Sequence, residues 1–214
     1  FLNKEISDLK VVINGAGAAG VAIAKLLKCI EIESNVCTPV SEIIICDTKG
    51  IIHKQRNDLT PLKFELLSFT NPNNKKGTLR DAIKEADVFI GVSTEDLLST
   101  DDITTMAKSP IIFAMANPNP EITPDQAYAG GAGVVGTGRS DLPNQVNNVL
   151  AFPGIFRGAL DCRAKRITPK MKIAAAYAIA GCITTPSRDY IIPDTLDFSV
   201  SEAVSKAVMD AYEE

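Results

Sequence analysis

The chain has 214 residues, a length that one sizeable hydrophobic core can organise, so a single domain is expected. Apolar residues make up 45% and charged residues 22%, which is typical of a globular protein, and the net charge of −4 argues against a nucleic-acid partner. The sequence has no apolar run long enough for a membrane span and opens with no signal-peptide pattern, so we expect a cytoplasmic protein with no membrane partner; an organellar location stays open because Phe1 is not an initiator Met.

The first predicted element is a buried strand over residues 10–14, which runs directly into a glycine-rich turn. The turn reads Gly-x-Gly-x-x-Gly, and its residues are Gly15, Ala16, Gly17, Ala18, Ala19 and Gly20. In this motif the first glycine allows the tight turn, the second lets the backbone approach a pyrophosphate, and the third permits close helix-to-strand packing. An amphipathic segment follows, whose first N–H groups would point at the phosphates. This context favours a dinucleotide site over a mononucleotide site or a purely structural turn.

A dinucleotide site also needs an acidic residue at the end of the next strand, where it hydrogen-bonds the adenosine ribose. The apolar run 43–46 followed by Asp47 fits this description. Asp47 lies 47 − 15 = 32 residues after Gly15, more than the roughly 20 usually found, and a polar loop over residues 33–40 would absorb the excess. Asp47 favours NAD, while Lys49 and His53 nearby leave NADP possible.

The five cysteines show no metal-binding pattern. They are scattered, odd in number and without C-x-x-C spacing, so zinc and disulfides are not expected and reduced thiols are. The single histidine, His53, has no partner motif that would make it a catalytic base. We therefore expect no metal ligands in this chain.

The middle of the chain alternates predicted helices and strands. Helices are expected from Thr60-Pro61, over residues 78–86 with a cap at Thr78, and over residues 103–108, the last capped by the cluster Ser99 to Asp102. Strands are expected over residues 86–93 and 110–116. Ligands lie beyond the carboxyl ends of the strands in a doubly wound sheet, so Val92 and Ser93 are expected to line the cleft.

The second of these strands ends in Asn117-Pro118, which places a side-chain amide that can both donate and accept hydrogen bonds just past the strand end. Taken alone, Asn117 fits a ligand-gripping position and an Asx turn equally well. Thr123-Pro124 begins a short helix, and the second Gly-x-Gly-x-x-Gly match, over residues 131–136, is a decoy because no strand precedes it. Residues 134–137 are expected to form a short strand instead.

The last third is predicted to be mainly helical. The amide-rich segment 144–150 would need partners if buried, which a polar ligand of Asn147 and Asn148 would supply. Helices are expected over residues 152–160 and 170–182, and a final helix carries an apolar stripe from Val200 to Ala211 that must be covered by this domain or another. The expected fold is α/β: a Rossmann-type doubly wound, mostly parallel sheet with helices on both faces. It fills residues 1–214 as one domain, with a core over about 8–185 and a helical extension over 186–214.

Three motifs are more particular than a general dinucleotide fold. They are residues 12–20, the turn Ala116-Asn117-Pro118, and the run from Gly138 to Asp161, GRSDLPNQVNNVLAFPGIFRGALD. With these motifs the chain resembles the C-terminal, NAD-binding domain of malic enzymes of the shorter, bacterial-like type. The resemblance implies oxidative decarboxylation of malate to pyruvate and carbon dioxide, with NAD or NADP and with Mg²⁺ or Mn²⁺ in the full-length enzyme.

The resemblance also assigns residues. Gly15 to Gly20 would bind the pyrophosphate and Asp47 the adenosine ribose, Val92, Ser93 and Asn117 would lie along the nicotinamide half, and Asn117 and Asn148 would reach the substrate. The catalytic Tyr and Lys and the metal ligands of malic enzymes lie ahead of this region, in an N-terminal domain absent from this chain. The isolated domain is therefore expected to bind coenzyme without turning over malate, and the full-length form to be a homodimer or larger. A malolactic enzyme and a free-standing NAD-binding sensor stay open as alternatives.

Overall fold

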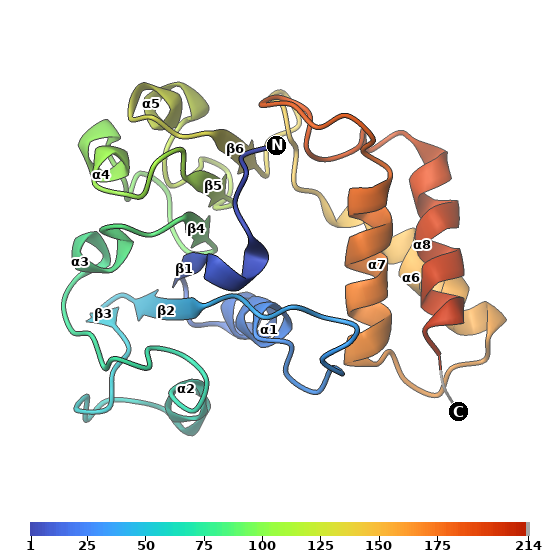
Figure 1. Cartoon of the computed structure of the whole chain (residues 1–214), viewed down its shortest axis with the longest axis horizontal. Coiled ribbons are helices and arrows are strands. Elements are labelled where there is room, and N and C mark those ends of the chain that lie inside the picture. Colours follow the sequence, from blue (N-terminus) through green and yellow to red (C-terminus); the bar gives the residue numbers. More distant parts are fainter. Residues whose placement is uncertain (213–214) are drawn as a thin grey trace. The chain divides into compact units, whose positions relative to one another are not determined.

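The computed structural model describes residues 1–212, and its framework is a six-stranded sheet (Figure 1). The strands are ordered β3-β2-β1-β4-β5-β6. All neighbouring pairs are parallel except β2 with β3, which is antiparallel. Their bounds are β1 (Lys10–Asn14), β2 (Glu42–Asp47), β3 (Gly50–Ile51), β4 (Val88–Gly91), β5 (Ile111–Ala114) and β6 (Val134–Thr137). The predicted doubly wound, mostly parallel sheet is confirmed.

The described chain divides into two compact units. The first comprises residues 1–28 and 38–139 and holds the sheet; the second comprises residues 29–37 and the described residues from 140 onward. The units therefore part at Arg139, whereas the sequence predicted one core extending to about residue 185. The helices that follow residue 140 pack among themselves, so they form a core of their own.

Both faces of the sheet are covered by helices. On one face, strand residues such as Val12, Phe89 and Ile112 pack against α3 (Leu79–Ile83), α4 (Thr100–Thr104) and α5 (Pro124–Ala129). On the other face, strand residues such as Ile13 and Ile43 pack against α1 (Ala18–Leu27) and α2 (Pro61–Leu66). Figure 1 shows α3, α4 and α5 following one another beside the strands. Burial on both faces explains why the strands read as continuous apolar runs rather than alternating patterns.

The capping residues predicted at helix starts are confirmed, although one helix begins earlier than predicted. Thr78, Ser99 and Thr123 each accept a hydrogen bond from the backbone N–H three residues later, and each forms a capping box. Thr60 caps α2 in the same way, with Pro61 at the first helical position. The helix predicted over residues 103–108 was placed too late, because the Ser99 cap begins α4 at Thr100.

The outer edge of β2 is closed by irregular chain rather than by a long strand. β3 pairs with only Cys46 and Asp47. Further along, the Ile52 N–H donates to the Ile45 carbonyl at 2.9 Å and the Asn71 N–H donates to the Ile43 carbonyl at 2.7 Å. Asn71 is buried, and its side chain donates to the Ile52 carbonyl. Backbone groups of β2 are thus satisfied on both sides of the strand.

The second unit is a small helical core. It contains η2 (Asn148–Leu150), α6 (Phe152–Asp161), α7 (Pro169–Gly181) and α8 (Phe198–Asp210), and α8 packs on both longer helices. Two glycines of α6 allow this approach, since a Cβ at Gly154 or Gly158 would lie within 3 Å of Val204 or Val208. The α8 stripe is therefore covered within its own unit, where Val200, Val204 and Val208 are buried.

One expectation about the cysteines was wrong. Cys29 and Cys37 form a disulfide across a separation of eight residues, with Cα atoms 5.8 Å apart. Sequence spacing gave no sign of this pairing, because it depends on how the loop between α1 and β2 turns back on itself. Cys46, Cys162 and Cys182 are free thiols, as predicted. None of the helices within residues 1–212 has the length and apolar character needed to cross a lipid bilayer.

Candidate coenzyme-binding site

A pocket of about 790 Å³ opens at the carboxyl ends of β1, β2 and β4. Several residues predicted from the sequence line it together: Gly15, Ala16, Gly17, Asp47 and Ser93. Residues that the sequence analysis had not assigned to the site also line it, among them Asn14, Lys63, Thr78 and Leu97. The crevice beyond the strand ends is where doubly wound folds bind their ligands. A dinucleotide-sized space is thus present at the position that the glycine motif indicated.

The glycine-rich turn forms one wall of the pocket, and its three glycines differ in their surroundings. Gly15 has a φ of +126°, and a Cβ there would lie 2.7 Å from the Val92 carbonyl oxygen. A Cβ at Gly20 would overlap the Gly15 carbonyl oxygen, so this glycine lets α1 pack onto the turn. Gly17, the N-cap of α1, has no neighbour within 4 Å of its missing Cβ and supplies no side-chain cap. The turn therefore leaves open space at the positive end of a ten-residue helix, which suits a phosphate.

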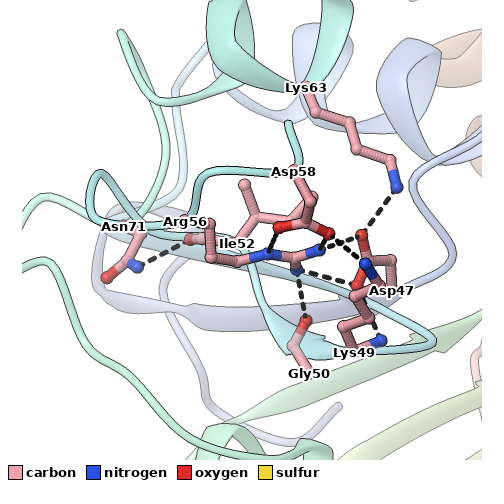
Figure 2. Close-up of polar contacts among 8 residues, drawn as sticks. All are labelled: Asp47, Lys49, Gly50, Ile52, Arg56, Asp58, Lys63 and Asn71. Atoms are coloured by element: carbon pink, nitrogen blue, oxygen red, sulfur yellow. Dashed lines mark hydrogen bonds and ion pairs between the residues drawn. The ribbon is translucent and has the colours of Figure 1, made fainter. Parts of the chain in front are cut away.

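Asp47 is held by four hydrogen bonds (Figure 2). Arg56 forms a bidentate pair, with Nη1 2.8 Å from Oδ1 and Nη2 3.0 Å from Oδ2. The Lys63 Nζ lies 2.6 Å from Oδ2, and the Lys49 backbone N–H lies 2.9 Å from Oδ1. The carboxylate is only 8% exposed. Asp47 is at the predicted strand end, but its oxygens already have donors on the protein.

The Asp47 cluster carries net positive charge. Arg56 also pairs with Asp58, which in turn pairs with the Lys49 ammonium at 2.9 Å. Three cations and two carboxylates give 3 − 2 = +1 for the group Asp47, Lys49, Arg56, Asp58 and Lys63. Partial burial raises the pKa of Asp47, but the hydrogen bonds from Arg56 and Lys63 outweigh burial and hold the pKa at about 2. Asp47 is therefore ionised at neutral pH, with its charge compensated.

Sequence reasoning identified Asp47 but missed its cationic partners. Arg56 and Lys63 lie nine and sixteen residues further along, in the loop after β3 and in α2. A basic side chain in a loop or on the exposed face of a short helix is most often solvated, so neither position was distinguished in the sequence. The sequence did contain one indication: the basic residues from Lys49 to Lys63 outnumber the two acidic residues near them, Asp47 and Asp58.

The ends of β4 and β5 bring further predicted residues into this unit. The Asn14 Nδ2 donates to the Ser93 hydroxyl at 2.7 Å, which ties the end of β1 to the loop after β4. Val92 continues β4, with its N–H donating to the Asn14 carbonyl. Asn117 is exposed just past β5, and a Cβ at Gly138 would lie 3.2 Å from its Oδ1. Val92, Asn117 and Gly20, together with the exposed Ala18 and Ala19, are not among the residues that line the pocket.

The amide-rich segment lies in the second unit, and its burial differs from expectation. Asn147 and Asn148 are exposed; the Asn147 side chain caps η2 by accepting from the Val149 N–H. The buried amide is Asn144, whose Nδ2 donates to the Arg188 carbonyl and whose Oδ1 accepts from the Ile191 N–H, both at 2.9 Å. The argument that Asn147 and Asn148 need a ligand because they are buried was therefore wrong. Within residues 1–212, no group of three or more His, Cys, Asp or Glu side chains is arranged to hold a metal ion.

Comparison with known proteins gives one consistent family. Residues 1–212 match the family model described as "Malic enzyme, NAD binding domain". The chain is 55% identical over 211 residues to the bifunctional malic/malolactic enzyme of Bacillus subtilis, covering 97% of this chain and 50% of that protein. It is 48% identical over 213 residues to the NAD-dependent malic enzyme of Geobacillus stearothermophilus, covering 99% and 43%.

A solved structure agrees with these relatives. The NAD-dependent malic enzyme of Thermotoga maritima superposes with a TM-score of 0.87 at 42% identity, covering 96% of this chain and 52% of that one. Other relatives are named as NADP-dependent malic enzymes. The chain spans about half the length of the curated relatives it matches.

Proposed function

Because the chain belongs to the malic enzyme family as its NAD-binding domain, we propose that it supplies the coenzyme site of an enzyme that oxidatively decarboxylates malate to pyruvate and carbon dioxide. The single observation that carries the proposal is the pocket of about 790 Å³ whose wall is the glycine-rich turn at the end of β1. Gly17 leaves space there for a pyrophosphate at the start of α1.

The pocket and the strand-end residues near it have proposed roles in binding the coenzyme. The backbone from Gly15 to Gly20 binds the pyrophosphate, and Asp47 accepts hydrogen bonds from the adenosine ribose once Lys63 moves aside. Val92, Ser93 and Asn117 orient the nicotinamide half, which the fixed positions of the β4 and β5 ends support. The bound coenzyme supplies the hydride acceptor; the residues of this chain set its position and exclude water.

The substrate and metal sites are proposed to involve more than these residues. Asn117 and Asn148 are proposed to contact the malate end of the site. The catalytic Tyr and Lys and the ligands of Mg²⁺ or Mn²⁺ are proposed to lie in another domain of the enzyme, and the active assembly is proposed to be a homodimer or larger. The half-length coverage of relatives supports a second domain of similar size.

We propose NAD as the preferred coenzyme, with NADP accepted more weakly. Asp47 at the end of β2 supports NAD, because a carboxylate there pairs with the ribose diol. Arg56 compensates the Asp47 charge, however, and the ammonium groups of Lys49 and Lys63 face the same region. Repulsion of a 2′-phosphate is therefore weaker than an isolated aspartate would produce.

Calorimetry and product analysis test the proposal on the intact protein that carries these residues. NAD should bind with one site per chain, and malate with Mn²⁺ should give pyruvate and NADH in equal amounts. Lactate without net NADH would indicate the malolactic reaction instead. Tight NAD binding with no turnover of malate in the intact protein would favour a sensor.

A further inference from the structure

The ends of β4 and β5 are joined by a buried carboxylate that the proposed coenzyme contacts do not use. Glu121 is 0% exposed. Its Oε1 accepts from the Ser93 N–H at 3.3 Å, and its Oε2 accepts from the Ala116 N–H at 3.0 Å. Ser93 and Ala116 each stand two residues past the last paired residues of the two strands, Gly91 and Ala114. The carboxylate therefore bridges the strands where their backbone ladder has ended.

The fold is shaped to admit this carboxylate. A Cβ at Gly91 would overlap the Glu121 carboxyl group, so the glycine at the end of β4 provides its space. The Glu121 carbonyl accepts from the N–H groups of Leu97 and Leu98 at 2.9 and 3.0 Å. Leu97 lines the coenzyme pocket. One residue thus fixes three segments that converge on the same edge of the sheet.

The electrostatics of Glu121 are unusual for a residue that serves packing alone. Within residues 1–212 no lysine, arginine or histidine pairs with its carboxylate, which accepts instead from two backbone amides. Burying a carboxylate without a cation is costly, and backbone N–H groups offset only part of that cost. An apolar side chain would fill the same space more cheaply but would leave two strand-end amides without an acceptor. Glu121 therefore fixes the positions of those two amides at a cost in stability.

We propose that Glu121 is a positioning residue for the nicotinamide half of the coenzyme. It acts through Ser93, whose hydroxyl also accepts from Asn14, and through Ala116, the residue before Asn117. The adenosine half lies over β1 and β2, which Glu121 does not contact. This inference rests on the proposed function, since that assigns Ser93 and Asn117 to the nicotinamide end.

The test compares two ligands, NAD and ADP-ribose, which lacks the nicotinamide. In Glu121→Gln the side chain keeps its shape, but its NH₂ group faces one backbone N–H, so one of the two hydrogen bonds is lost. We expect the Kd for NAD to rise about tenfold, while the Kd for ADP-ribose changes by less than about twofold. Turnover should fall with the NAD affinity. Both affinities are measured by calorimetry on the intact protein.

The matched control is Asp102→Asn, which alters another buried carboxylate of the same unit. Asp102 caps α4 through Ser99 and pairs with Arg80, and none of these three residues lines the pocket. Asp102→Asn should lower Tm without changing the ratio of the Kd for NAD to the Kd for ADP-ribose. Where Glu121→Gln does not fold, Glu121→Asp, whose shorter side chain cannot reach both amides, should give the same selective loss.

Two results would overturn the inference. One is an unchanged Kd for NAD in a folded Glu121 variant; the other is an equal loss of NAD and ADP-ribose, as a general loss of structure would produce. A wild-type protein that binds neither ligand would instead remove the proposed function itself. The two failures are therefore distinguishable.

Discussion

The Lys63 ammonium lies 2.6 Å from the Asp47 Oδ2, on a carboxylate that Arg56 already holds in a bidentate pair. An acidic residue at the end of the second strand ordinarily disfavours the 2′-phosphate of NADP. Here the acid is compensated, and Lys63, which lines the pocket, is 26% exposed while Arg56 is 8% exposed. Lys63 is therefore, with the more exposed Lys49, a cation of this cluster that a ligand can reach, and it is the one of the two that contacts Asp47 through its side chain.

Replacing Lys63 should change coenzyme choice. In Lys63→Met the pocket loses an ammonium and Asp47 gains a free lone pair, so NADP should bind about tenfold more weakly while NAD binds as well or better. Titration of both coenzymes against the intact protein measures the ratio. Lys25→Met, which removes an exposed ion pair with Glu65 outside the pocket, should leave the ratio unchanged. Equal effects of Lys63→Met on NAD and NADP would contradict the prediction.

The Asp47 cluster should also make the fold sensitive to acid. The pKa of Asp47 falls from 3.8 to about 2 on folding, so its contribution to stability is complete above about pH 4 and is lost as pH falls toward 2. Asp47→Asn should therefore lower stability at neutral pH and flatten this part of the pH dependence. Denaturant unfolding at a series of pH values from 7 down to 2 checks it. Parallel curves for the two proteins would show that Asp47 does not titrate in this way.

Alanine at two glycines of the same turn should have different effects, one on NAD binding and the other on the stability of the fold. At Gly17 a methyl group meets nothing within 4 Å, so Gly17→Ala should change the free energy of unfolding by less than about 1 kcal/mol. The same methyl group would occupy the space proposed for the pyrophosphate and should weaken NAD binding. At Gly20 it would overlap the Gly15 carbonyl, so Gly20→Ala should destabilise the fold by about 1–3 kcal/mol or more. Thermal unfolding and NAD titration of both variants separate the two effects.

The Cys29–Cys37 disulfide should contribute measurably to stability. Closing a loop over an eight-residue separation restricts the unfolded chain. In the chain-entropy model this restriction raises the free energy of unfolding by about 2–3 kcal/mol. Reductant should lower Tm, and Cys29→Ser should start from that lower value and show no further response. Cys162→Ser, which removes a free thiol, should respond to reductant like the wild type. A Tm that reductant leaves unchanged would argue against the bond in solution.

Features encoded by neighbouring residues were predictable. The strand runs, the caps at Thr78, Ser99 and Thr123, and the glycine turn each place their signal within a few positions, because the interactions that stabilise them are local. The short strand over residues 134–137 was also correct, since the glycine match there lacked a preceding strand. The residues expected to line the cleft from β1, β2 and β4 include Gly15, Gly17, Asp47 and Ser93, which do lie together.

Features that depend on distant residues were not predictable. The donors on Asp47, the carbonyl and amide partners of Asn144, and the bridge made by Glu121 all join segments that meet only in three dimensions. Glu121 follows Pro120 in what reads as an ordinary polar loop. A buried acid cannot be distinguished from a solvated one by its neighbours in sequence, because burial is set by the strands that surround it.

The irregular chain along β2 has a consequence for how this protein resists self-association. Residues 43–46, Ile-Ile-Ile-Cys, form an uncharged, β-branched run of the kind that templates intermolecular strands when its edge is open. β3 pairs with Cys46, and Ile52 and Asn71 occupy the rest of that edge, so the run is shielded by a few residues rather than by a full strand. Asn71→Ala would keep the backbone bond to Ile43 but lose the side-chain bonds to Ile52 and Lys75 that fix residue 71 in place. The cover should then loosen, and the earliest aggregates formed on mild heating should contain β2 at their centre.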